Sequence, residues 1–458
     1  MKVVINLNLK ITNYECIEDF LSDSHLSDFF KVNDGVISIL FTSLQHRFFM
    51  LFKDKTLIIS DSLIFLSANY MVKTSEDANS FYSKFGFIFP PFTQYEDVYL
   101  IAPYIEFTIS DDNLSFKNKL PERERENDEI KLENVLNDYF NAFENNSLNV
   151  LVSGGIDSSA LLGLLNENKR VGSTFMCKMS SLPAEGELAA ELSDSASIPF
   201  RLIDLDLDLS DRADEFVSET GEYIADSIAL VFPELFSSLN CTKKDNLYLV
   251  DGQGADSLLN GLPLNKIYNF WNKLHLLRPL LKPLSWVPIY KDKSTPFKRK
   301  AYRITKAVNC LAQSDFRISI LTAMIEKEGM PSKIESYFLD ELEKFYRHFN
   351  DWHLVIRFLY MFRVLPAREM QKYLFAKKYN ITMVAPFLEP KVIQTLLFMS
   401  NESSIKDGLY KYPITKLAQK YWPGHFEKSK TSPFQVNYSV GCGDLKNYSL
   451  KFFSENPK

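Results

Sequence analysis

Residues 150–165 place a strand, a glycine turn and a helix in immediate succession. Their aliphatic start suits a buried central strand, and the leucines at their end suit the apolar face of a helix. The turn Ser153-Gly154-Gly155 contains two residues without a Cβ, so their amide groups can approach an anion closely. The hydroxyls of Ser153 and Ser158 add donors at the positive end of the helix dipole. The stretch therefore predicts a phosphate-binding loop.

Asp157 is the unexpected member of this loop, because a carboxylate beside bound phosphates is repelled unless a cation lies between them. It therefore predicts magnesium bridging to a polyphosphate. The loop has no GxxxxGK[ST] lysine, no GxGxxG pattern and no G-x-S-x-G serine, so other glycine-loop chemistries fit poorly. An ordinary strand-turn-helix corner is the alternative, but it does not explain so many polar groups in one short stretch.

A second strand and glycine turn follow later, in Asp251-Gly252-Gln253-Gly-Ala-Asp256-Ser257. If both turns lie at the ends of parallel strands in one sheet, Asp256 comes close to Asp157, and the two carboxylates can share one magnesium ion bound to a polyphosphate. A helix N-cap is the simpler role for Asp256, but capping explains neither glycine of the turn.

The order of elements predicts the architecture. Residues 1–120 contain short strands separated by turns, which predicts an all-β domain, a sandwich. Its strands are expected at 3–9, 35–41, 48–52, 56–60 and 105–109. The charged run 121–129 is expected to be a linker. Residues 130–458 then alternate strand-like and helical patterns, which predicts a parallel doubly wound α/β sheet with a helical C-terminal part. Its strands are expected at 150–152, 172–176, 200–205 and 246–250, and helices at 352–379.

Composition limits the class of protein. The chain has 458 residues, enough for two domains, and its 46% hydrophobic and 24% charged residues are typical of soluble globular proteins. A net charge of −6 does not predict nucleic-acid binding. The N-terminus does not resemble a signal peptide, and no apolar run is long enough to span a bilayer. Five cysteines without CxxC spacing predict reduced thiols. A cytoplasmic protein without a membrane partner is expected.

Residues 266–306 contain eleven Lys and Arg and a single acid, Asp292. Such a run can bind an acidic substrate, a peptide or a tRNA. A solvated helical face is the simpler interpretation, and the sequence does not decide between them.

Five stretches carry a family resemblance. SGGIDSS resembles the SGGxDS loop of the ATP pyrophosphatases, which split ATP into AMP and pyrophosphate while activating a carboxylate or carbonyl oxygen. The second turn resembles the SGEGADE loop of asparagine synthetases. Residues 385–390 resemble their PFLDP element, and residues 427–434 resemble the RxKxxF element that contributes an active-site lysine. By motif position this lysine is Lys430, with Lys428 as the alternative. Residues 86–103 resemble the segment that closes the glutaminase-like N-terminal domain of asparagine synthetases.

The resemblance implies an AMP-forming amide ligase with a degenerate glutaminase-like β domain and an ATP-binding synthetase domain. ATP and Mg²⁺ are the implied cofactors. A substrate carboxylate would attack the α-phosphate to give an acyl-adenylate, which an amine would then capture. Lys430 would neutralise charge on the α-phosphate, and Gln253 is the second catalytic position. The implied ATP-binding residues are Val152, Ser153, Gly154, Gly155, Asp157, Ser158, Cys177, Gly252 and Gln253, and the implied metal ligands are Asp157 and Asp256.

Three positions depart from asparagine synthetases. The family's glutaminase uses a cysteine at position 2, where this chain has Lys2, and a lysine cannot form the thioester. Gln253 stands in place of a glutamate thought to deprotonate ammonia, and an amide cannot accept that proton. Ser257 replaces an acid. β-Lactam synthetases and lasso peptide cyclases, which join an amine and a carboxylate of one substrate, also vary here. The amine is therefore expected from an organic substrate or free ammonia, and biosynthetic proteins are candidate partners.

Three alternatives stay open on sequence alone. One is an ammonia-dependent enzyme like asparagine synthetase. Another is a nucleotide-gated scaffold in a biosynthetic complex, although a scaffold would not need two aspartates for a magnesium bridge. Sulfur transfer to tRNA would require a catalytic cysteine, and only Cys177 falls near the loops, where the family places a residue against adenine.

Overall fold

The computed structural model describes residues 2–6, 30–33, 36–44, 47–110, 113–122, 132–143, 146–179, 185–205, 209–240, 246–283, 296–326, 329–426 and 445–455. Two sequence predictions fall largely or wholly outside these ranges. The expected linker 121–129 is described only at its first two residues, and both candidate lysines, Lys430 and Lys428, lie outside the described residues.

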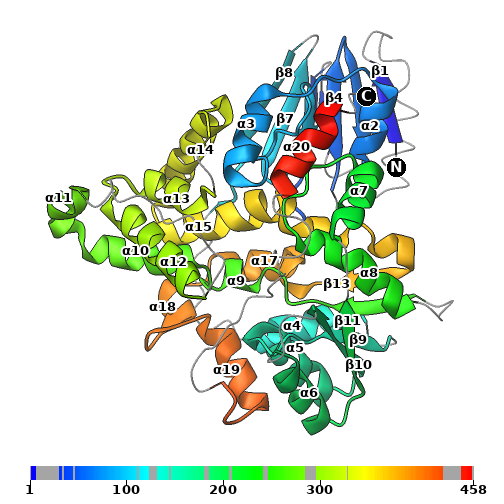
Figure 1. The fold of residues 1–458 in the computed structure, drawn as a ribbon, viewed down its shortest axis with the longest axis vertical. Helices are drawn as coiled ribbons and strands as arrows, with labels where there is room; N and C mark the ends of the chain where they lie inside the picture. The colour runs from blue at the N-terminus through cyan, green and yellow to red at the C-terminus, as the bar shows by residue number, and fades with distance from the viewer. Residues whose placement is uncertain are drawn as a thin grey trace.

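A five-stranded parallel sheet forms the centre of the C-terminal part (Figure 1). Its strand order is β11-β10-β9-β12-β13. The strands are β9 (Leu148–Leu151), β10 (Val171–Met179), β11 (Phe200–Leu205), β12 (Leu247–Val250) and β13 (Ile381–Val384). The parallel sheet and its first four strands confirm the sequence prediction. The fifth strand was missed, because a four-residue run after a helical stretch gives little periodicity.

The strand order creates the place for a ligand. From β9 the chain moves outward through β10 to β11, and then returns to place β12 on the other side of β9. Ligands of open α/β sheets bind at such a reversal, beyond the carboxyl ends of the strands. Helices α5 (Ile156–Glu167) and α6 (Glu185–Ser195) lie on one side of the sheet and α8 (Ile228–Asn240) on the other. The two predicted loops follow β9 and β12, so both lie at this reversal.

The N-terminal part contains two four-stranded antiparallel sheets. One has the order β1-β5-β4-β6, with β1 (Lys2–Asn6), β5 (Thr56–Ser60), β4 (Phe49–Lys53) and β6 (Val98–Leu100). The other has the order β2-β3-β7-β8, with β2 (Phe30–Asn33), β3 (Val36–Leu40), β7 (Ile105–Ser110) and β8 (Asn113–Asn118). Side chains from both sheets, among them Ile39, Met50 and Phe107, form one buried apolar cluster. All five strands predicted in this part are present.

The expectation of an all-β N-terminal part was wrong, because it also contains helices α2 (Leu63–Asn69) and α3 (Glu76–Phe85). Each begins after a serine whose hydroxyl accepts a hydrogen bond from a backbone amide of the first turn. Ser62 accepts from Phe65 and Ser75 from Ala78. Such caps satisfy amides that a helix leaves open at its start.

The N-terminal sheets are joined to the C-terminal part by buried polar contacts. Arg47 pairs with Glu222, and Tyr82 donates its hydroxyl proton to the carbonyl of Ile224 at 2.7 Å. Helix α3 packs against α14 (Lys333–Phe349), and the apolar core runs through both parts without a break. Residues 86–103, which resemble a family segment, are mostly buried at this junction.

The remaining helices flank the sheet and extend away from it. Helix α15 (Trp352–Leu359), the π-turn Tyr360–Val364, and the 3₁₀ turns Glu369–Tyr373 and Ala376–Tyr379 confirm the helical prediction for residues 352–379. Helices α10 (Pro263–Lys273) and α12 (Pro296–Ala312) project sideways with α11 (Arg278–Leu281) at their outer end (Figure 1). In the described part of the chain, no helix combines the length and apolar character needed to cross a membrane.

Candidate active site

A cavity of about 870 Å³ opens at the carboxyl ends of β9 and β12. It is lined by most of the residues predicted to bind ATP and metal: Val152, Ser153, Gly155, Asp157, Ser158, Cys177, Gly252, Gln253 and Asp256. Gly154 is the exception. Its φ of +73° makes the turn possible, and a Cβ there would lie 3.4 Å from Leu188 Cβ, so it shapes the loop without facing the cavity.

The first loop is held in shape by its own serines. The Ser153 and Ser158 hydroxyls lie 3.2 Å apart, and the Ser153 amide donates to the Ser158 hydroxyl at 3.2 Å. The Gly155 amide donates to the Ser153 hydroxyl at 3.3 Å. The loop is therefore ordered by contacts within itself, directly before the N-terminus of α5, where a phosphate is favoured.

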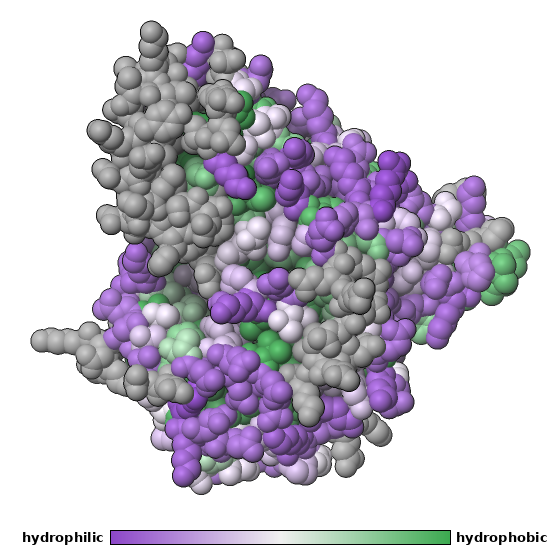
Figure 2. Space-filling view, turned by 180° about the vertical axis from the view of Figure 1, so that it is seen from behind, coloured by the Kyte–Doolittle hydropathy of each residue, from purple (hydrophilic) through white to green (hydrophobic). Residues whose placement is uncertain are grey.

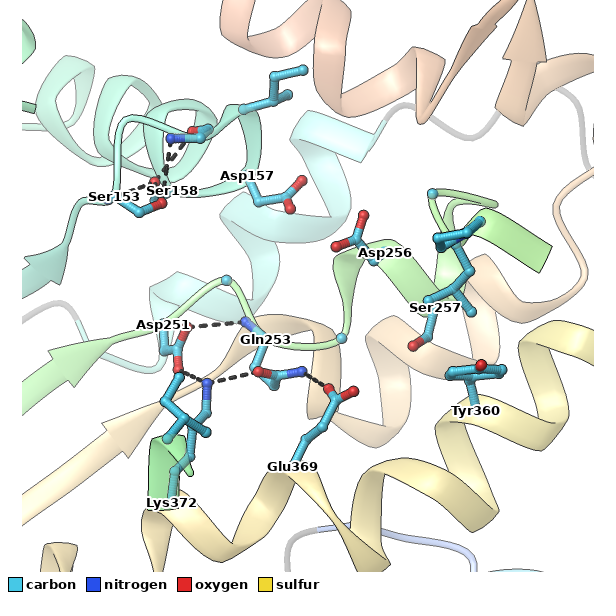
Figure 3. Close-up of a pocket in the computed structure, with 18 of the residues that line it drawn as sticks. Ser153, Asp157, Ser158, Asp251, Gln253, Asp256, Ser257, Tyr360, Glu369 and Lys372 are labelled. Atoms are coloured by element: carbon cyan, nitrogen blue, oxygen red, sulfur yellow. Dashed lines mark hydrogen bonds and ion pairs between the residues drawn. The ribbon is translucent and has the colours of Figure 1, made fainter. Parts of the chain in front are cut away.

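Lys411 joins the two predicted metal ligands. Its Nζ lies 2.6 Å from Asp157 Oδ2 and 2.9 Å from Asp256 Oδ1. Asp157 and Asp256 point toward a common space from the two loops (Figure 3). The lysine is buried at 4% exposure, and burial works against its charge, but the two carboxylates outweigh this and raise its pKa. Lys411 is therefore a fixed positive charge between the loops.

Helix packing places Lys411 at the site. It precedes α19 (Tyr412–Tyr421), which lies against α5 so closely that a Cβ on Gly163 would come within 2.4 Å of Tyr421 Cβ. A Cβ on Gly261 would lie 2.3 Å from both Asp256 Oδ1 and Lys411 Cδ. Glycine at 261 is thus needed for the lysine to reach Asp256. Sequence reasoning missed Lys411, because nothing in its local sequence separates it from a surface lysine.

Asp157 has the properties expected of a metal ligand. Burial raises its pKa, the charge of Lys411 opposes the rise, the Asp256 carboxylate adds to it, and the result is about 6. Its Oδ1 is buried and has no hydrogen-bond partner. A buried carboxylate oxygen without a partner is costly unless a ligand meets it, and a cation would do so.

The described residues contain no group of three or more Asp, Glu, His or Cys that could hold a metal by themselves. Mg²⁺ is commonly bound through one or two carboxylates together with substrate phosphates and waters. Asp157 and Asp256 therefore fit an ion that arrives with a nucleotide, whereas they do not form a complete protein cage.

A second buried lysine, Lys372, organises the loop after β12. Its Nζ lies 2.7 Å from Asp251 Oδ2 and 2.6 Å from Gln253 Oε1. The Tyr373 hydroxyl donates to Asp251 Oδ2 at 2.7 Å. The Gln253 amide nitrogen donates to the Glu369 carboxylate (Figure 3). Both the oxygen and the nitrogen of the Gln253 side-chain amide therefore have hydrogen-bond partners within the protein.

Glu369 lines the cavity beside Gln253. Burial raises its pKa, against the opposing charges of Arg368 and Lys372. Sequence reasoning missed Glu369 and Lys372. Their spacing of three residues in a helical turn puts them on one side of it, but no motif relates that turn to the loop at 253.

Cys177 lies in β10 and lines the cavity, as expected. Burial raises the pKa of its thiol to about 12, so at neutral pH it is protonated and a poor nucleophile. Cys177 and its apolar neighbours Phe175 and Met176 form a wall of the cavity. The environment of Cys177 does not favour sulfur transfer.

Part of the basic stretch also contributes to the lining of the cavity. Lys266 and Ile267 of α10 contribute to it, as do Tyr302, Arg303 and Lys306 of α12. The cavity is therefore lined both by the aspartates and glycine turns of the two loops and by cations of the basic stretch.

Comparison with known protein families gives one match. Residues 142–457 match the family model described as asparagine synthase. This range covers well over half of the chain and includes β9, both loops, Lys372 and Lys411. No curated protein matches the chain.

Proposed function

The chain belongs to the asparagine synthase family, whose members are ATP-dependent carbon-nitrogen ligases, and we propose that it adenylates a substrate carboxylate and transfers the acyl group to an amine. One observation carries the proposal. Two glycine turns at the reversal of a parallel sheet present Asp157 and Asp256 to one cavity, with Lys411 fixed between them. This arrangement supports the binding of a magnesium-bound triphosphate.

The nucleotide is proposed to lie across the two loops. The Ser153 to Ser158 turn and the start of α5 receive the phosphates, and the wall around Cys177 receives the adenine. Asp157 and Asp256 would hold Mg²⁺, which neutralises the phosphates and polarises the α-phosphorus. Lys411 orients both carboxylates and adds positive charge where the pyrophosphate departs.

The proposed reaction has two steps. A carboxylate oxygen of the substrate attacks the α-phosphorus, the bond to the β-phosphate oxygen breaks, and pyrophosphate leaves with that electron pair. The nitrogen of an amine then attacks the acyl carbon of the adenylate, AMP leaves with the electrons of the acyl-oxygen bond, and the amine loses a proton. We place Lys430 as a second cation for the first step, as the family resemblance implies.

Glu369 is proposed to take the amine's proton. Gln253 cannot accept it, but Glu369 is bonded to Gln253 and lines the same cavity. Its raised pKa makes it a stronger base than an ordinary glutamate and brings it closer to neutral pH. Glu369 would thus provide the carboxylate base that Gln253 cannot provide.

The amine is proposed to come from an organic substrate. No cysteine occurs among the described residues of the N-terminal sheets, and Lys2 pairs with Ser60 within β1 and β5. We therefore propose a glutaminase-like domain that does not hydrolyse glutamine. Closure of a lactam or macrolactam within one substrate is the form that we favour, because such ligases vary at positions 253 and 257. Use of free ammonia is the second candidate.

Exchange of labelled pyrophosphate into ATP tests adenylation. The wild type should catalyse magnesium-dependent exchange with one carboxylate from a panel of free aspartate, amino-acid derivatives and short peptides. Asp157→Ala should lose it by about a thousandfold or more. Tight ATP binding without exchange for any carboxylate would instead favour a nucleotide-gated scaffold. Exchange that survives in Asp157→Ala would contradict the site assignment.

A further inference from the structure

Exposed apolar side chains concentrate on one projection of the molecule. We call α10, the 3₁₀ turn His275–Leu277, α11 and α12 the arm (Figure 1). Most of the large apolar residues that are exposed in the described chain lie on it: Phe270, Leu276, Leu277, Leu280, Phe297 and Ile304. Leu276 and Phe297 are each 81% exposed. Figure 2 shows hydrophobic residues at the outer end of the arm beside hydrophilic ones. A concentration of this kind marks an interaction surface.

The arm is also strongly basic within an acidic protein. The chain has a net charge of −6, yet residues 263–282 and 296–312 contain four and five Lys and Arg, with no Asp or Glu. Lys273, Lys300 and Arg303 form no ion pair in the described part of the chain. Positive charge without neutralising partners attracts an acidic ligand.

Cations and apolar residues alternate along the helices. On α10, Lys266, Phe270 and Lys273 follow one another at intervals of four and three residues, so they share one face. On α12, Phe297 and Lys300 share a face in the same way with Ile304. Because α10 and α12 pack together, a ligand can contact both helices. Its complement is a chain segment with acidic and apolar side chains in alternation.

The arm continues into the active-site cavity. Lys266 of α10 and Arg303 of α12 belong to the cavity wall and also to the basic surface. A flat anionic membrane would contact the outer end of the arm but would not account for cations inside a cavity. An extended chain that leads from the arm to the aspartates accounts for both.

We propose that the arm binds a polypeptide substrate rich in acidic and apolar residues, and directs its reacting carboxylate into the cavity that Lys266 of α10 and Arg303 of α12 help to line. The substrate role of this polypeptide rests on the proposed ligase function. The proposal that the arm binds an acidic and apolar polypeptide does not depend on that function. The acidic side chains would pair with Lys273, Lys300 and Arg303, and the apolar ones would cover Phe270 and Phe297. A free amino acid is too short to use this surface.

Fluorescence anisotropy with labelled synthetic peptides tests the surface. A peptide alternating Glu with Leu and Phe should bind the full-length protein, and matched peptides with Lys for Glu, or Ser for Leu and Phe, should bind at least about tenfold more weakly. Lys273→Glu combined with Lys300→Glu should weaken binding of the first peptide by about tenfold or more. Phe270→Ser combined with Phe297→Ser should do the same. Lys377→Glu combined with Lys391→Glu makes the same charge change on exposed lysines elsewhere and should leave binding intact.

Four outcomes would overturn the proposal. The first is that the acidic peptide binds the variant with both Lys273→Glu and Lys300→Glu as tightly as the wild type, and the second is that the Lys-substituted peptide binds the wild type as tightly as the acidic one. The third is that the protein binds phosphatidylglycerol vesicles but none of the peptides. The fourth is that the protein forms a concentration-dependent dimer that Leu280→Ser abolishes. Pyrophosphate exchange separates this proposal from the ligase. Exchange with small carboxylates and no peptide binding rejects the arm alone, whereas peptide binding without any exchange rejects the ligase and the substrate role together.

Discussion

Two buried lysines lie beside the two loops, and they differ in whether the carboxylates around them have hydrogen-bond partners for all their oxygens. Lys411 bonds one oxygen of Asp157 and one of Asp256. The other oxygen of Asp157, Oδ1, is buried without a hydrogen-bond partner. Two carboxylates beside one ammonium also leave an excess of negative charge. Lys411 and the two aspartates are therefore not fully satisfied within the protein, and a bound cation would satisfy them.

The group around Lys372 is complete within the protein. Both oxygens of Asp251 accept hydrogen bonds, one from the Gln253 backbone amide and the other from Lys372 and Tyr373. The Gln253 side chain accepts from Lys372 and donates to Glu369. A closed network fixes side chains in one arrangement and needs no ligand for stability. If the proposed function is correct, Lys411 would serve metal and phosphate chemistry, while Lys372 would position the groups that act on the amine.

Among the substitutions at the two lysine groups, Lys411→Met should have the largest effect on pyrophosphate exchange. Without its ammonium, Asp157 and Asp256 repel each other, and Asp157 takes up a proton that blocks metal binding. We expect pyrophosphate exchange to fall by about a thousandfold. Lys416→Met is the matched control, because Lys416 is exposed on α19, the helix that Lys411 precedes. Lys411→Arg keeps the charge and tests whether loss reflects misfolding. Near-normal exchange in Lys411→Met would show that the carboxylates do not need the lysine.

Glu369→Gln should separate the two steps. The glutamine can still accept the hydrogen bond from Gln253 but cannot take a proton. Amide formation should therefore fall by about a hundredfold or more, while pyrophosphate exchange stays close to that of the wild type. Single-turnover assays on preformed adenylate measure the second step alone. Equal loss in both assays would show that Glu369 supports the site as a whole and is not the base.

The pH dependence of stability distinguishes the two groups further. The folded pKa of Asp157, about 6, lies above its ordinary value, so protonation favours the folded state. In metal-free protein this contribution is fully present at low pH and is lost as pH rises through about 6. We expect the unfolding free energy to fall by on the order of 1 kcal/mol between about pH 5 and pH 7, relative to Asp157→Asn. Urea titrations of both proteins measure this difference. If the unfolding free energies of the two proteins change with pH in parallel, the raised pKa of Asp157 is contradicted. With added Mg²⁺, the unfolding free energy of the wild type should rise with pH, relative to Asp157→Asn, where it falls in metal-free protein.

The loops and the sheet were predictable because local sequence determines them. A strand, a turn with glycines and a helix leave a pattern within one stretch, and parallel order then brings the ends of β9 and β12 together. The N-terminal strands showed the same kind of signal. Helices α2 and α3 did not, because they are short and lie among strands.

The charged partners were not predictable, because they reach the site through packing over long sequence distances. Lys411 depends on α19 lying against α5 and on Gly261 leaving room for its side chain. Glu369 and Lys372 depend on a turn that packs under the loop at Gln253. None of these residues lies in a motif. A lysine or glutamate in a helical sequence is most often on the surface, so sequence alone gives no reason to choose them.

Tyr373→Phe should have the smallest effect and tests whether the Lys372 group is truly closed. The change removes one hydrogen bond to Asp251 Oδ2, but Lys372 still lies 2.7 Å from that oxygen, so no buried acceptor is left without a partner. We expect a loss of only about 0.5 kcal/mol in unfolding free energy and unchanged pyrophosphate exchange. Urea denaturation and the exchange assay measure the two quantities. A clear loss of pyrophosphate exchange in Tyr373→Phe would mean that Asp251 acts directly on the nucleotide. The groups around Lys411 and Lys372 would then both take part in adenylation.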